Sequence, residues 1–104
     1  MSLSDLYDQL KTVYTTAYLE FPESEVPAPP YLCYYDTGST NFVAENKVYH
    51  VILDVTVELY TSEKDPSAEA AVEAIFDLND IPWQKTSEFL EDENIFCVTY
   101  TMEV

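Results

Sequence analysis

The first part of the chain has apolar residues at the spacing of one helical face, which predicts a helix over residues 4–18. Its apolar stripe would consist of Leu3, Leu6, Leu10, Val13, Tyr14 and Ala17. Ser2 or Ser4 can cap this helix by accepting a hydrogen bond from a free backbone amide of its first turn. Four prolines between residues 22 and 30 then exclude a helix and favour an extended connector over residues 20–30.

After the connector the pattern changes to the two-residue period of strands. We predict short strands at residues 31–35 and 42–45, with a turn at 36–41 between them. A second turn at 45–47 leads into a long strand over residues 48–60, whose apolar face would consist of Tyr49, Val51, Leu53, Val55, Val57 and Leu59. At ~3.3 Å per residue this strand is about 40 Å long, so we expect one end to project beyond the core as a hairpin with the preceding strand.

A second helix is predicted to begin at Asp65 and Pro66, with aspartate as the cap and proline at the first helical position. Its apolar stripe would consist of Ala68, Ala71, Val72, Ile75 and Phe76, with Glu69 and Glu73 outside it. Residues 79–82 end this helix. A weak strand at 83–88, an acidic turn at 91–94 and a last strand at 95–104 follow.

These elements predict a single domain of the α+β class over residues 1–104. The expected order is helix, three strands, helix, two strands. Strands joined by short turns pair in antiparallel fashion. We therefore expect a mostly antiparallel sheet of four to five strands with both helices packed on one face.

The charge of the chain limits its partners. It has 20 acidic residues, four lysines and no arginine, for a formal net charge of -16. Binding to the nucleic-acid backbone or to anionic membranes requires basic residues, so we expect neither. Strong acidity instead suits repelling DNA, mimicking DNA or meeting a basic partner, and it equally serves solubility alone.

Both cysteines, Cys33 and Cys97, lie in apolar segments, where a free thiol acts as a small hydrophobic group. We find no basic segment followed by an apolar one at the N-terminus, and no apolar run of membrane-spanning length. We therefore expect a cytoplasmic protein with reduced thiols.

No set of residues indicates catalysis, a cofactor or a metal site. His50 is the only histidine, and catalysis by it would need a partner nucleophile. Neither cysteine lies in a reactive-thiol motif. Gly38 is the only glycine, which excludes glycine-rich phosphate loops. The densest carboxylate group consists of Glu88, Glu91, Asp92 and Glu93. It lacks the glycine and spacing of a calcium loop, so we expect a solvated turn.

The tyrosines indicate contact with other proteins. Alternation along the strand puts Tyr31 and Tyr35 on one face and Tyr34 on the other. Helices on one face cannot cover both sets, so either some rings are left for a neighbouring subunit or they only flank the helices. The candidate subunit-interface residues are Phe21, Val26, Tyr31, Tyr34, Tyr35 and Phe42.

Three stretches resemble the small tail-completion and tail-terminator proteins of long-tailed bacteriophages and prophages. The first is a helix with Leu6, Tyr7 and Leu10, leading through the connector to the tyrosine-rich strand. The second is the segment of residues 41–49 that enters the long strand. The third is the helix after Asp65, followed by the Trp83 strand and the acidic hairpin.

This resemblance implies a structural role without enzymatic activity or cofactor. It implies a ring, typically of six copies, made in the bacterial cytoplasm and placed at the tail–head junction of the virion. The partners would be further copies of the chain, the tail tube and the head connector. Glu88, Glu91, Asp92 and Glu93 would then help DNA pass the lumen without binding. The alternative is a small acidic DNA mimic that inhibits a nucleic-acid-binding enzyme.

Overall fold

The computed structural model describes residues 2–104, except for the side chains of residues 40, 42–44 and 48–50. The elements in chain order are α1 (Leu3–Leu10), β1 (Thr15–Tyr18), β2 (Tyr31–Ala44), β3 (Lys47–Thr61), α2 (Pro66–Leu78), β4 (Trp83–Leu90) and β5 (Ile95–Glu103). A 3-10 helix at Glu23–Glu25 interrupts the connector. The predicted α+β class is confirmed. The predicted succession of one helix, three strands, one helix and two strands is also found, but two of the strands differ from the predicted ones: β1 lies within the predicted first helix, and the strands predicted at residues 31–35 and 42–45 form the single strand β2.

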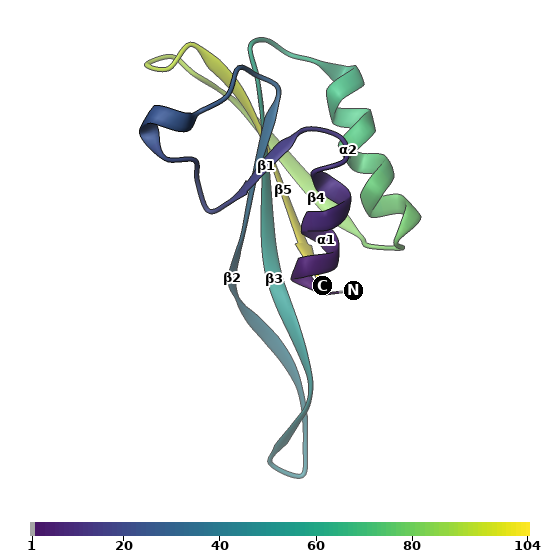
Figure 1. Ribbon diagram of the computed structural model, residues 1–104. Helices are drawn as coiled ribbons and strands as arrows, with labels where there is room; N and C mark the ends of the chain where they lie inside the picture. The colour runs from purple at the N-terminus through teal and green to yellow at the C-terminus, as the bar shows by residue number, and fades with distance from the viewer. Residues whose placement is uncertain (1) are drawn as a thin grey trace.

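The five strands form one sheet in the order β1-β2-β3-β5-β4. β1 runs parallel to β2, and all other neighbours are antiparallel. Both helices cover one face of this sheet, while the connector lies on the other side (Figure 1). The buried core between the helices and the sheet includes Leu6, Leu10, Leu32, Val57, Leu59, Val72, Phe76, Val98 and Tyr100.

The first helix is shorter than predicted, because it ends at Leu10. Ser2 caps it, and the side chain of Asp5 completes the capping box. Residues 15–18 form the edge strand β1, with Thr15 opposite Tyr31. Consecutive β-branched residues at Thr15 and Thr16 favour a strand over a helix, and the helical spacing of the apolar residues concealed this preference.

The strand β2 is longer than predicted, because residues 36–41 continue the strand and do not form a turn. A register shift between Asp36 and Gly38 interrupts the pairing without ending it. The predicted turn at 45–47 is confirmed, since Glu45 and Asn46 both have positive φ, at 53° and 62°. Such values are typical of the two-residue turn of a β-hairpin.

The second helix begins as predicted, since the Asp65 side chain accepts a hydrogen bond from the Ala68 amide. The position of Glu69 was predicted wrongly: this side chain is buried, and the residue is 3% exposed. Its Oε1 lies 3.0 Å from Lys85 Nζ and its Oε2 lies 2.7 Å from Lys64 Nζ. Burial alone would raise the pKa of Glu69, but the ammonium groups of these two lysines outweigh burial and hold the pKa below its ordinary value.

The same network joins α2 to the sheet. Lys85 of β4 also lies 2.8 Å from Glu73 Oε2. That carboxylate oxygen accepts a second hydrogen bond, of 2.8 Å, from the hydroxyl of Tyr100 on β5. Two carboxylates of α2 are therefore held against β4 and β5 by one shared ammonium group.

Candidate subunit interface

The most prominent feature of the molecule is the β2–β3 hairpin, which extends well beyond the helices and the other strands (Figure 1). The molecule measures 50 × 27 × 23 Å, and the hairpin accounts for its long axis. This confirms the prediction that one end of the long strand projects from the core.

The projecting part of the hairpin has open strand edges. β1 pairs with β2 only as far as Tyr34, and the pairing of β5 with β3 ends where Val104 meets Leu53. Beyond these points, the described sheet pairs β2 and β3 only with each other. Half of the backbone amide and carbonyl groups on each outer edge then point away from the hairpin. Val51, which is 61% exposed, adds apolar surface on this segment. Natural proteins normally cover, shorten or charge such an edge, so this one suits pairing with another chain.

The connector covers the sheet face opposite the helices, beside the start of β2. Phe21 packs edge-on against Tyr31, with ring centroids 5.5 Å apart, and Tyr31 stacks on Tyr60 at 4.9 Å. Tyr31, Cys33 and Ile95 form a second small core beneath it. The sequence prediction omitted this layer, although the apolar residues among the prolines were its signal.

This second layer changes the assignment of the candidate tyrosines. The predicted alternation is confirmed, because Tyr34 belongs to the helix-side core and Tyr31 to the connector-side core. Both residues are 8% exposed and are therefore covered by the chain itself. The inference that helices on one face leave such rings for a neighbour was wrong for Tyr31 and Tyr34, because the connector covers the other face.

The remaining candidate residues differ in exposure. Val26 is exposed, and Phe21 and Tyr35 are partly buried. The side chain of Phe42 lies outside the described residues, as does that of His50. Four exposed apolar side chains that the sequence did not single out are Tyr18, Leu19, Leu78 and Phe89. Tyr18 is the last residue of β1 and packs edge-on against Tyr34 of the helix-side core, and Leu19 follows it.

The two cysteines are buried and unbonded. Cys33 lies on β2 opposite Glu58 of β3, and Cys97 lies on β5 opposite Tyr60 of β3, so that β3 runs between the two cysteines. They are therefore separated by two strand spacings, or about 9.6 Å, which exceeds the reach of a disulfide. Burial, with a smaller contribution from Glu58, raises the pKa of the Cys33 thiol to about 11. Such a thiol is a packing group and a poor nucleophile at neutral pH.

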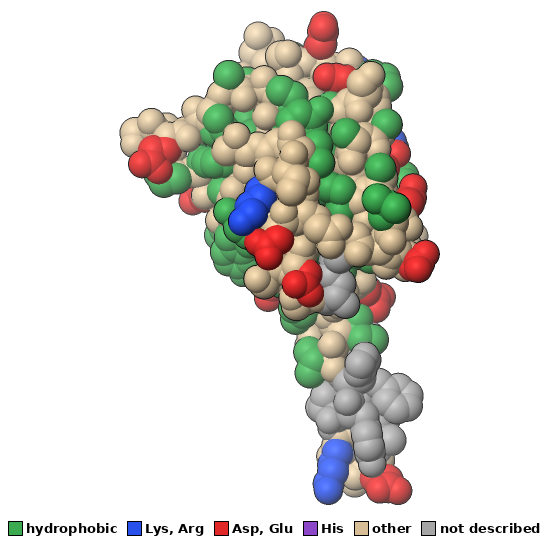
Figure 2. Space-filling view, turned by 45° about the vertical axis from the view of Figure 1, so that its right-hand side comes forward, with side chains coloured by type: hydrophobic (Ala, Val, Ile, Leu, Met, Phe, Trp, Pro, Cys, Tyr) green, Lys and Arg blue, Asp and Glu red, His purple; other side chains and the backbone are tan. Residues whose placement is uncertain are grey.

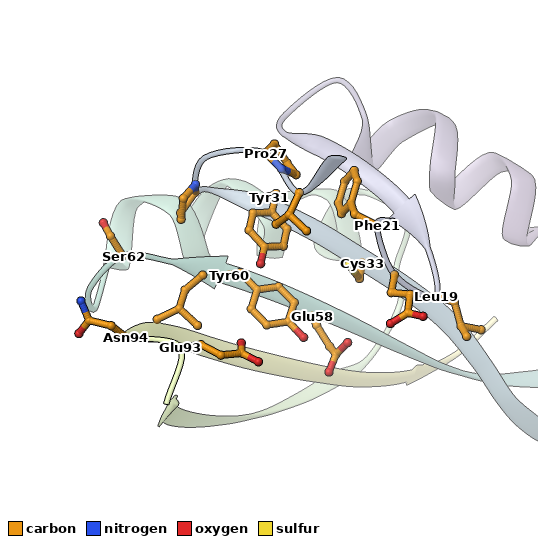
Figure 3. A pocket seen from close by; sticks show the side chains of 14 residues that line it. Leu19, Phe21, Pro27, Tyr31, Cys33, Glu58, Tyr60, Ser62, Glu93 and Asn94 are labelled. Carbon is orange, nitrogen blue, oxygen red and sulfur yellow. The ribbon is translucent and has the colours of Figure 1, made fainter. Parts of the chain in front are cut away.

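A cavity of about 740 Å³ lies between the connector and the second sheet face (Figure 3). Apolar and aromatic side chains form its walls, among them Phe21, Val26, Tyr31 and Tyr60. Its lining also includes the carboxylates of Glu20, Glu58 and Glu93, and no lysine. Burial raises the pKa of Glu58 above its ordinary value, while a hydrogen bond with Tyr60 partly opposes the effect.

Glu58→Gln is expected to raise the free energy of unfolding at about pH 8 more than at about pH 5. The folded pKa of Glu58 is raised, so its contribution to stability is complete below the unfolded pKa and is lost as the pH rises through the folded pKa. Glutamine retains the shape without the charge. Urea denaturation at both pH values measures the difference. Glu88→Gln is the control, because it removes the same charge from an exposed position. Equal pH dependence of the two variants would contradict this electrostatic interpretation.

The four acidic candidates lie together where β4 turns into β5. Glu88, Glu91, Asp92 and Glu93 are all exposed, and the predicted turn at residues 91–94 is confirmed. Among the described residues, no group of three or more potential ligands is arranged to hold a metal ion. Figure 2 shows acidic side chains scattered over one face of the molecule. Whether this turn faces DNA stays a prediction.

A scan against known protein families and a search of curated protein sequences found no match for this chain. Within the described residues, neither helix is long and apolar enough to cross a membrane.

Proposed function

We propose that this chain is a structural subunit of the tail–head junction of a long-tailed bacteriophage or prophage. It forms a ring with further copies of itself, of six subunits as the resemblance implies, and it contacts the tail-tube and head-connector proteins. The observation that carries this proposal is the projecting β2–β3 hairpin with its open edges. A monomeric protein gains nothing from such an exposed segment, whereas a ring subunit can use it to pair with its neighbour.

The charge of the chain supports the same function. A ring through which DNA passes must not retain the phosphate backbone, and carboxylates provide no attractive contact for it. A net charge of -16 meets this requirement. The exposed group of Glu88, Glu91, Asp92 and Glu93 is the candidate for the lumen surface.

DNA mimicry is the alternative that the charge also permits. A mimic needs carboxylates in a row with the spacing of phosphates on one exposed face. The carboxylates on the visible face are dispersed among apolar and neutral side chains (Figure 2). Mimicry also leaves the open hairpin unexplained, so the assembly function is favoured.

Deletion of the gene tests the proposal. We expect DNA-filled heads and separate tails, or tails of abnormal length, in electron micrographs of the lysate. Complementation with the wild-type chain should restore joined particles, and antibody labelling should place the chain at the junction. Normal joined and infectious particles without the gene would contradict the proposed function.

A further inference from the structure

We propose that the tip of the β2–β3 hairpin of one copy places Lys47 into the carboxylate-lined cavity of a neighbouring copy. The inference rests on the proposed ring, and it names the two surfaces that meet within it. The occupant of the cavity is therefore a second copy of this chain.

Lys47 is the available cation. Lys11 is paired with Asp8, Lys64 with Glu69, and Lys85 with both Glu69 and Glu73. Among the described residues, Lys47 is the one lysine without an ion pair, and it is exposed beside the hairpin turn. In a chain with 20 acidic residues and four lysines, an unpaired lysine at the hairpin tip, far from the core, is a candidate contact for a carboxylate of another molecule.

The cavity has the properties that a lysine side chain requires. The carboxylates of Glu20, Glu58 and Glu93 offer charges to the ammonium group, and the described lining contains no cation to compete with it. The aromatic side chains of Phe21, Tyr31 and Tyr60 can pack on the aliphatic stem. A volume of about 740 Å³ also leaves room for the backbone of the turn that carries the lysine.

The contact must form between two molecules. Tyr60 lines the cavity, and the strand β3 runs from Lys47 at the tip to this residue. At ~3.3 Å per residue these two positions are about 40 Å apart in one chain. A contact between two different surfaces of identical chains is head-to-tail, and it closes into a ring when the rotation between copies allows it.

Carbodiimide cross-linking tests this contact, because the reagent joins a lysine to a carboxylate only where the two already meet. An equal mixture of ¹⁵N-labelled and unlabelled chain is treated up to its solubility limit, and the cross-linked peptides are identified by mass spectrometry. We expect mixed-isotope peptides that join Lys47 to Glu20, Glu58 or Glu93. An absence of intermolecular products, or products at other carboxylates only, would overturn the inference.

Charge reversal provides a second measurement by sedimentation velocity. Lys47→Glu and Glu93→Lys are each expected to weaken self-association about tenfold or more, and the double variant should recover most of the loss. Lys11→Glu is the control, because it makes the same change on a lysine outside the hairpin. Failure of the double variant to recover would also overturn the inference. These results are separate from the gene deletion, which decides the proposed function without reference to Lys47.

Discussion

Lys85→Met is expected to lower the free energy of unfolding by about 1–2 kcal/mol, because it removes one partner of a buried carboxylate while Lys85 itself is partly exposed. The ammonium group of Lys85 separates two carboxylates, at 3.0 Å from Glu69 and 2.8 Å from Glu73. Glu69 is only 3% exposed, so water cannot replace the lost partner. Tyr100 would still donate a hydrogen bond to Glu73, and Lys64 would still face Glu69, which keeps the expected loss from being larger.

Urea denaturation of Lys85→Met beside Lys11→Met measures this effect. The Lys11 pair with Asp8 is exposed, so its loss should cost less than about 1 kcal/mol. In the wild type the lowered pKa of Glu69 contributes stability above its unfolded pKa, which is lost as the pH falls through the folded pKa. The variant should reverse this trend and gain stability relative to the wild type in acid. Equal losses for the two substitutions would contradict a structural role for the network.

Shortening the hairpin is expected to abolish assembly while leaving the fold intact. Residues 40–52 can be replaced by Asn-Gly, because Ser39 and Leu53 are paired and a two-residue turn can connect them. None of the side chains that the structure describes in the removed segment belongs to the larger core, so the free energy of unfolding should change by less than about 1 kcal/mol. The open edges and Lys47 are lost together.

The matched control keeps the full hairpin and changes only its turn, as Glu45→Asn with Asn46→Gly. Both variants are compared with the wild type in urea denaturation and in complementation of the deleted gene. The shortened chain should fold and yet fail to restore joined particles, and the turn variant should restore them. Joined particles from the shortened chain would show that the hairpin is dispensable for assembly.

The sequence predicted the parts of the fold in which local preference and burial agree. The strand β3 alternates apolar and polar residues along its length, and Val55, Val57 and Leu59 enter the core as predicted. The helix α2 carries its own start signal in Asp65 and Pro66, and its apolar stripe meets the sheet. Each of these signals is contained in a few consecutive residues.

The errors lie where distant residues decide the structure. Residues 15–18 become a strand because β2 offers them a parallel neighbour. The two threonines were a weak local signal for a strand, and the helical spacing of the apolar residues outweighed it in the prediction. Residues 36–41 have the composition of a turn, but pairing with β3 holds them extended. Glu69 was placed outside the buried stripe of its helix, because its two lysines come from a loop and from another strand.

Only part of the candidate interface was predicted, because the rest depends on contacts between residues that are distant in the sequence. The projection of the hairpin follows from the length of β3, which the sequence states directly. The burial of Tyr31 depends on Phe21 and the connector, which fold back across the second face of the sheet. The cavity also needs that fold, because it brings Glu20 of the connector near Glu58 of β3 and Glu93 of the β4–β5 turn.

Amide hydrogen exchange measures directly whether neighbouring copies cover the hairpin. The outward-facing amides of residues 36–44 and 47–52 should exchange readily in the isolated chain, because only one partner strand protects this segment. In joined particles the same amides should exchange at least about a hundred times more slowly, while core amides such as those of Val57 and Val98 stay protected in both samples. Equal exchange of the hairpin amides in the isolated chain and in the particles would contradict coverage of its edges by another subunit.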